Sequence, residues 1–107
     1  MKNEATEKAI LACLSCMRAC NWCASECIRM ANADHVGCVE KCLDCAAICT
    51  MCAEFLSRDS SFGKPVMVLC AEICTACAEE CEKHAHHHEH CRICAEACRA
   101  CAEACRA

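Results

Sequence analysis

Cysteine thiols are the side chains most able to do chemistry in this sequence, and they account for 19 of its 107 residues. Every cysteine lies in one of four sets, within which successive cysteines are three or four residues apart in alternation. Deprotonated thiols are strong ligands for soft metal ions, and an odd number of them cannot all pair as intramolecular disulfides. The pattern therefore predicts metal binding on many thiolates. The candidate ligands are Cys13, Cys16, Cys20, Cys23 and Cys27; Cys38, Cys42, Cys45, Cys49 and Cys52; Cys70, Cys74, Cys77 and Cys81; and Cys91, Cys94, Cys98, Cys101 and Cys105.

The charge of a bound thiolate limits which metal suits such a core. Four thiolates around one Zn²⁺ would carry about −2, and five stacked layers of that kind would bring about −10 into the interior. A monovalent ion at about one per thiolate cancels this charge, and Cu(I) is the monovalent ion that soft sulfur ligands select. The sequence therefore predicts Cu(I) as the bound metal. A zinc or mixed-metal detoxification protein and an iron–sulfur electron-transfer protein stay open as alternatives.

Pairs of cysteines four residues apart offer one way to hold such ions. Side chains at positions i and i+4 of a helix have Cβ atoms about 5–6 Å apart, so that a two-coordinate ion fits between their sulfurs. The sequence contains eight such pairs, from Cys16/Cys20 to Cys101/Cys105. The remaining three cysteines are expected to bind between helices: Cys13, Cys52 and Cys91.

The same spacing identifies the elements that carry the thiols. Alternating steps of three and four residues place side chains on one stripe of an α-helix, so four sets predict four helices. We expect helices near residues 4–31, 34–57, 60–83 and 88–106, and the short connections between them make neighbouring helices antiparallel. The predicted fold is all-α: a single domain, 1–107, that forms an antiparallel up-down-up-down four-helix bundle with a Cys-lined core.

Three local details extend this prediction. Asp34 is a candidate N-cap for the second helix. Pro65 lies inside the predicted third helix, and we expect that helix to start early, near residue 60, with distorted first turns. Glu96 and Arg99 have the spacing of an ion pair on the outer face of the last helix.

The two ends of the predicted bundle differ in chemistry. At the end that joins the first helix to the second and the third to the fourth, the four stripes reach Met30, His35, His84 and His87. The opposite end is apolar, with Ala9, Leu56, Gly63 and Met67. Because imidazole can hold copper before it passes to thiolates, we predict that copper enters and leaves at the histidine end. A merely solvated polar turn is the alternative.

Within the histidine-rich segment 84–90, the stripes rank His84 and His87 above His86, His88 and His90. Replacing the two favoured histidines should slow copper loading and leave the final capacity nearly unchanged. Met67 stands where a fifth cysteine of the third set would be. Its neutral thioether is a soft ligand without charge, so we expect weak or absent copper binding there, and a simple plug of the bundle end is equally consistent.

Composition and charge exclude several functions. Eleven basic and fifteen acidic side chains give a net charge of −4 without a basic block, which argues against nucleic-acid binding. No apolar run approaches the length of a membrane span, and the N-terminal residues lack the features of a secretory signal. We therefore expect a cytoplasmic location without membrane association, where thiols stay reduced. No acid–base pair, phosphate loop or activated nucleophile stands out, so a binding protein is predicted rather than an enzyme.

The CxxxCxxC pattern on four predicted helices, the His-rich turn and the final CRICAEACRACAEAC resemble the bacterial copper storage proteins, over essentially the whole chain. The similarity is to the leaderless, cytosolic branch. It implies a four-helix bundle filled with many Cu(I) ions on cysteine thiolates, a homotetramer, and a role in copper storage and buffering. Leu11, Trp22 and Leu69 fall off the thiol stripes and would suit contacts between subunits. A copper chaperone or an efflux system is expected as a further partner.

Overall fold

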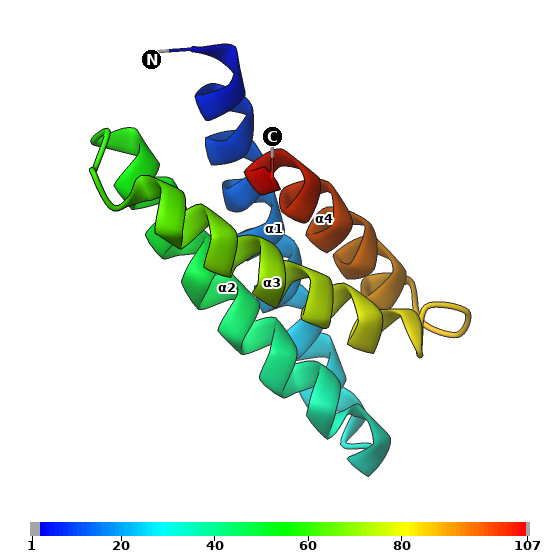
Figure 1. Cartoon of the computed structure of the whole chain (residues 1–107). Coiled ribbons are helices and arrows are strands. Elements are labelled where there is room, and N and C mark those ends of the chain that lie inside the picture. Colours follow the sequence, from blue (N-terminus) through cyan, green and yellow to red (C-terminus); the bar gives the residue numbers. More distant parts are fainter. Residues whose placement is uncertain (1–2, 107) are drawn as a thin grey trace.

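The computed structural model describes residues 3–106, which form four α-helices joined by short turns (Figure 1). The helices are α1, Glu4–Met30; α2, Val36–Ser57; α3, Gly63–Glu82; and α4, Glu89–Arg106. Both α1 and α3 pack against α2 and α4, and consecutive helices run in opposite directions (Figure 1). The bundle measures 43 × 18 × 17 Å. The predicted all-α, antiparallel four-helix bundle is confirmed.

The start and end of α1 follow from its flanking residues. The Asn3 side chain accepts a hydrogen bond from the Thr6 backbone N–H at 2.8 Å, which satisfies one of the unpaired donors of the first turn. Glu4 and Glu7 place negative charge at the positive end of the helix dipole. Ala31 then takes a left-handed conformation, with φ of 51°, and ends the helix.

The predicted N-cap of α2 is wrong. Asn32, rather than Asp34, caps the segment, because its side chain accepts a hydrogen bond from the Asp34 N–H at 2.9 Å and starts a 3₁₀ turn, Ala33–His35. This turn passes into α2 at Val36, with His35 as the residue before the helix. The 3₁₀ turn buries the His35 side chain at the end of the bundle.

The predicted early start of α3 is also wrong. Residues after Ser57 form a turn in which Asp59 is left-handed, with φ of 54°, and the helix begins only at Gly63. Pro65 is therefore the third residue of α3, where no intrahelical partner exists for a backbone N–H and a missing donor costs nothing. Proline fixes the start of this helix instead of distorting its interior.

The interior of the bundle is built almost entirely of sulfur and methyl groups. All nineteen cysteines are buried, and alanines such as Ala24, Ala78 and Ala102 lie beside them. Within residues 3–106, the only larger apolar side chains that are buried in this core are Ile10 and Ile48. Small flanking residues let the helix axes approach closely, so that the thiols of all four helices meet along one line.

An ion pair on the outer surface joins α3 to α4. The ion pair predicted between Arg99 and Glu96 is not formed. The Arg99 guanidinium instead binds Glu82 of α3 at 2.8 and 2.9 Å. Glu96 instead binds Arg92, one turn earlier in α4, at 3.0 Å.

No helix in residues 3–106 is long and apolar enough to cross a membrane.

Candidate metal site

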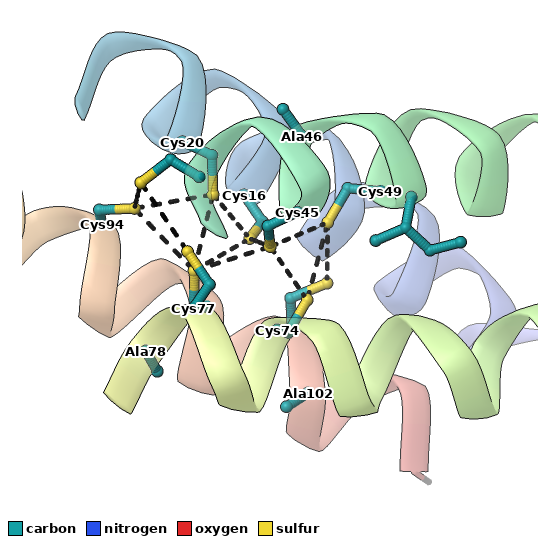
Figure 2. Close-up of a cluster of buried hydrophobic side chains, with 14 of the residues drawn as sticks. Cys16, Cys20, Cys45, Ala46, Cys49, Cys74, Cys77, Ala78, Cys94 and Ala102 are labelled. Carbon is teal, nitrogen blue, oxygen red and sulfur yellow. Dashed lines mark hydrogen bonds between the residues drawn. The ribbon is translucent and has the colours of Figure 1, made fainter. Parts of the chain in front are cut away.

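The thiols form a continuous column of sulfur atoms along the bundle axis. Sulfurs from different helices lie in direct contact: Cys16 of α1 is 3.7 Å from Cys45 of α2, and Cys45 is 3.6 Å from Cys74 of α3. Cys20 of α1 lies 3.6 Å from Cys98 of α4. Figure 2 shows the middle of this column, with thiols from all four helices pointing toward one another. The predicted convergence of four thiol stripes is confirmed.

Thiols one helical turn apart also contact each other. The Sγ atoms of Cys16 and Cys20 are 3.9 Å apart, and those of Cys45 and Cys49 are 4.0 Å apart. Such pairs lie within the reach of a single bridging ion once their rotamers adjust. Because each sulfur also contacts sulfurs on neighbouring helices, one thiolate can bridge two metal ions.

Several sets of four sulfurs are close enough to share one metal ion. Within each set, all four Sγ atoms lie within 4.8 Å of one another and all four side chains are buried. The sets share members, since Cys13, Cys16 and Cys20 each belong to two of them. The column is thus a series of overlapping sites rather than a row of separate ones. Three of the sets are Cys13/Cys52/Cys70/Cys105, Cys16/Cys49/Cys74/Cys101 and Cys20/Cys77/Cys94/Cys98.

Burial keeps the Cys27 and Cys91 thiols at the histidine end protonated when no metal is bound. It raises the pKa of Cys27 and of Cys91 above the ordinary thiol value, and the charges of neighbouring cysteines raise both further. A thiolate in this setting lacks both water and a counter-ion. Metal binding must therefore displace protons from the column.

Four histidines gather at one end of the column, and two of them contact the sulfur of Cys27. Cys27 Sγ lies 3.5 Å from His35 Nδ1 and 3.5 Å from His90 Nε2. His35 and His84 stack with ring centroids 4.0 Å apart, and His88 meets the His35 ring edge-on at 5.1 Å. We call His35, His84, His88 and His90 the histidine cluster.

The histidine cluster offers neutral nitrogen ligands beside the first thiols. Burial lowers the pKa of His35, and the positive charge that His84, His88 or His90 can carry lowers it further, so this imidazole is uncharged at neutral pH. His84 Nε2 is buried and has no hydrogen-bond partner. A buried imidazole nitrogen without a partner is an open position for a metal ion.

The histidines that lie in the cluster are not all those that the sequence favoured. His35 and His84 lie in the cluster as expected, whereas His87 is exposed and approaches only His88, with ring centroids 6.4 Å apart. His88 and His90 take its place. Both adjoin the start of α4, since His88 precedes Glu89 and His90 lies in the first turn. The available signals were the three-residue spacing from His88 to Cys91 and the four-residue spacing from His90 to Cys94, whereas the four-residue step back from Cys91 leads to His87.

The other end of the column is closed by apolar groups. Ala9 and Gly63 are buried, and Leu56 and Met67 are half-buried against the core. A Cβ added at Gly63 would come within 3.3 Å of Leu56 Cδ2, which shows how closely α2 and α3 approach there. Met67 lies one turn before Cys70 on the inner face of α3, in line with the thiols.

Comparison with known proteins adds to this geometry. The copper storage protein family matches residues 2–107. The chain belongs to the copper storage protein family. The family resemblance inferred from the cysteine pattern is therefore confirmed.

Relatives in this family cover nearly all of the chain. An uncharacterized cysteine-rich protein, YhjQ of Bacillus subtilis, is 44% identical over 92 residues, which are 85% of this chain and 83% of that protein. Copper storage protein 3 from Bacillus subtilis, solved without metal, is 44% identical with a TM-score of 0.86 over 94% of this chain and 95% of its own. A cytosolic copper storage protein from Streptomyces lividans, solved with five coppers, is 43% identical with a TM-score of 0.92 over 95% and 89%.

Proposed function

We propose that this protein stores Cu(I) on its nineteen buried cysteines, at about one ion per thiolate. The observation that carries this proposal is the unbroken column of free, buried thiols in mutual contact. Only a monovalent ion that accepts two or three thiolates, and shares them with its neighbours, can fill such a column without a large uncompensated charge. Copper is the cargo of the protein, and the role is storage rather than catalysis.

The family relatives support this assignment. The Streptomyces lividans protein is described as a copper storage protein, and one of its structures is loaded with 10 copper equivalents. The nineteen thiols that would bind such a load lie here on four helical stripes. By the same analogy we place the protein in the cytosol, where its thiols remain reduced until copper binds.

Copper is proposed to pass through the histidine cluster. This cluster presents imidazole nitrogens within 3.5 Å of Cys27, the outermost thiol of α1 at that end, whereas the other end has no nitrogen or carboxylate ligand among Ala9, Leu56, Gly63 and Met67. An ion can therefore move from imidazole to thiolate without crossing apolar groups. We propose that Met67 closes the far end and binds copper weakly or not at all.

The exposed apolar side chains fit an assembly of several copies. Leu11, Trp22 and Leu69 are 59%, 43% and 46% exposed, although they are large and apolar. They lie outside the thiol column, on α1 and α3. We propose that they pack between subunits of a homotetramer, with residues 1–107 of each chain as one storage domain. A copper chaperone or an efflux system would then exchange copper with the assembly.

An anaerobic titration of the fully reduced protein with Cu(I) tests the proposed storage role. A chromophoric Cu(I) chelator competes for the metal, so that the endpoint counts only tight sites. We expect an endpoint on the order of twenty copper ions per chain, because two-coordinate ions share bridging thiolates. An endpoint of only a few ions would contradict storage. Colour typical of iron–sulfur clusters after anaerobic purification would instead favour electron transfer.

A further inference from the structure

Four sulfurs near the middle of the column lie close enough together to surround one metal ion. They belong to Cys16, Cys20, Cys45 and Cys98. We propose that this group, the central tetrahedron, is a preorganised site for one divalent ion of the Zn²⁺ type in the copper-free protein. The site would use the same thiols as copper storage, but through a different coordination and at far lower stoichiometry.

Five of the six sulfur–sulfur distances within the central tetrahedron are almost equal. Cys16 Sγ lies 3.9 Å from Cys20, 3.7 Å from Cys45 and 3.7 Å from Cys98. Cys98 Sγ lies 3.6 Å from Cys20 and 3.9 Å from Cys45. The remaining edge, from Cys20 to Cys45, is within 4.8 Å. Figure 2 shows Cys16, Cys20 and Cys45 turned toward the same point from α1 and α2.

These edges match those of a tetrahedral zinc site. A Zn–S bond of about 2.3 Å in a regular tetrahedron requires sulfurs about 3.8 Å apart. The five edges between 3.6 and 3.9 Å already meet this requirement before metal binds. The ion would therefore enter without a rearrangement of helices, and its ligands come from three of them.

The surroundings of the central tetrahedron also suit the charge of such a site. One Zn²⁺ replaces four thiol protons and leaves a net charge of −2 on the group. A neighbouring thiol outside the group can donate an S–H hydrogen bond to its thiolates: Cys94 Sγ is 3.6 Å from Cys20 and 3.9 Å from Cys98. Charge-assisted bonds of this kind are the stronger class, and they spread the negative charge.

Shared ligands restrict how many divalent ions the column can take. Cys20 and Cys98 also belong to the group with Cys77 and Cys94, and Cys16 belongs to another group. An ion in the central tetrahedron therefore prevents complete coordination in both adjoining groups. Divalent binding should stop at a few ions per chain, whereas Cu(I) fills the column by sharing every thiolate.

Co²⁺ and Zn²⁺ added to the reduced, copper-free full chain under anaerobic conditions test this proposal. The first Co²⁺ per chain should give the strong visible bands of a tetrahedral four-thiolate site, and one equivalent of Zn²⁺ should remove them. X-ray absorption at the zinc edge should show four sulfur neighbours at about 2.3 Å. Nitrogen or oxygen neighbours, or a six-coordinate Co²⁺ spectrum, would overturn the proposal, because they would place the ion outside the column.

Matched serine variants locate the site. Loss of a partner that only orients a ligand typically costs about 10–100-fold in metal affinity, so loss of a direct ligand in Cys45→Ser should weaken binding of the first Zn²⁺ by at least about tenfold. Cys91→Ser also removes a buried thiol but lies outside the group, and should leave that affinity within about twofold. Equal losses in both variants would refute the assignment. If Cys45→Ser does not fold, a crystal structure of the zinc-bound unmodified chain with anomalous scattering at the zinc edge shows which four sulfurs hold the ion. The Cu(I) titration is independent of this outcome.

Discussion

At one end of the bundle the thiol column meets four histidines, and at the other it meets Leu56, Gly63 and Met67. The helices carry the same cysteine repeat up to both ends. The chemical difference between the ends therefore comes from the residues that lie beyond the terminal cysteine of each stripe. The 3₁₀ turn before α2 and the turn before α4 bring imidazoles over Cys27. At the closed end, Leu56 of α2 and Met67 of α3 pack against the core instead. The same core therefore has one end suited to metal exchange and one end that is closed.

The largest expected effect concerns the column that both ends enclose. Each tight site filled at 100 times its Kd stabilises the folded state by about 2.7 kcal/mol, because the unfolded chain lacks the assembled site. Two such sites should already raise the Tm of a domain of this size by about 20 °C or more. Calorimetry of the copper-free and Cu(I)-loaded protein measures this difference, and removal of copper with a chelator should reverse it. An unchanged Tm would show that copper binds outside the column.

The second largest effect is expected from pH, because a lower pH should weaken copper binding. Because burial raises the pKa of Cys27 and Cys91, these two thiols hold their protons at neutral pH in the copper-free protein, and Cu(I) must displace them. Affinity should thus fall as the pH falls, by about tenfold per pH unit for each proton released. Competition titrations at pH 8, 7 and 6 measure the slope. An affinity independent of pH in this range would contradict protonated thiols in the copper-free core.

The rate of uptake distinguishes the two ends. The pKa of His35 is lowered, so that this imidazole stays neutral until the pH falls below its ordinary value. Replacing His84→Ala together with His88→Ala should slow Cu(I) loading by about tenfold, the size of effect seen when groups that guide a metal are lost. The final capacity should remain nearly the same, because the thiols are untouched. Stopped-flow mixing with a Cu(I)–chelator complex measures the rate.

The exposed histidines of the same turn provide the control for this experiment. His86→Ala together with His87→Ala removes as many imidazoles from the same segment, but both side chains lie outside the histidine cluster. This variant should load at close to the normal rate. Equal slowing in both double variants would show that the turn acts only as a polar surface.

The smallest effect is expected at the closed end. Met67→Leu conserves volume and should change the free energy of unfolding by less than about 1.5 kcal/mol. It should leave the copper capacity unchanged to within one ion and the loading rate unchanged, since copper does not pass Met67. Met67→Cys is the variant to compare with it, because a thiolate in line with Cys70 should raise the copper capacity by about one ion per chain. A slower uptake by Met67→Leu would indicate a second route.

The cysteine spacing was enough to predict four helices, their inner faces and the thiol column. A repeat of three and four residues has one structural solution, and nineteen residues obey it without exception. The turns were harder to predict, because their geometry depends on single backbone conformations. Left-handed Asp59 delays α3 to Gly63, and the Asn32 side chain sets the 3₁₀ turn that buries His35.

Contacts between helices also escaped prediction from spacing along one helix. His88 and His90 reach the column because the turn after α3 continues to residue 88 before α4 begins, which moves His87 to the surface. Arg99 binds Glu82 because α3 and α4 lie side by side. The spacing of residues within α4 does not predict a contact with another helix. The Arg99 guanidinium lowers the pKa of Glu82 through these bonds.

The most direct test of copper storage in the thiol column is a crystal structure of the Cu(I)-loaded protein with anomalous scattering at the copper edge. Copper positions should run along the bundle axis, each bound by thiolates from Cys13 at the closed end to Cys27 at the histidine end. Histidine-bound copper should be confined to the His35–Cys27 region. Copper found only at the histidines or on the outer surface, with the thiols unligated, would contradict storage in the column.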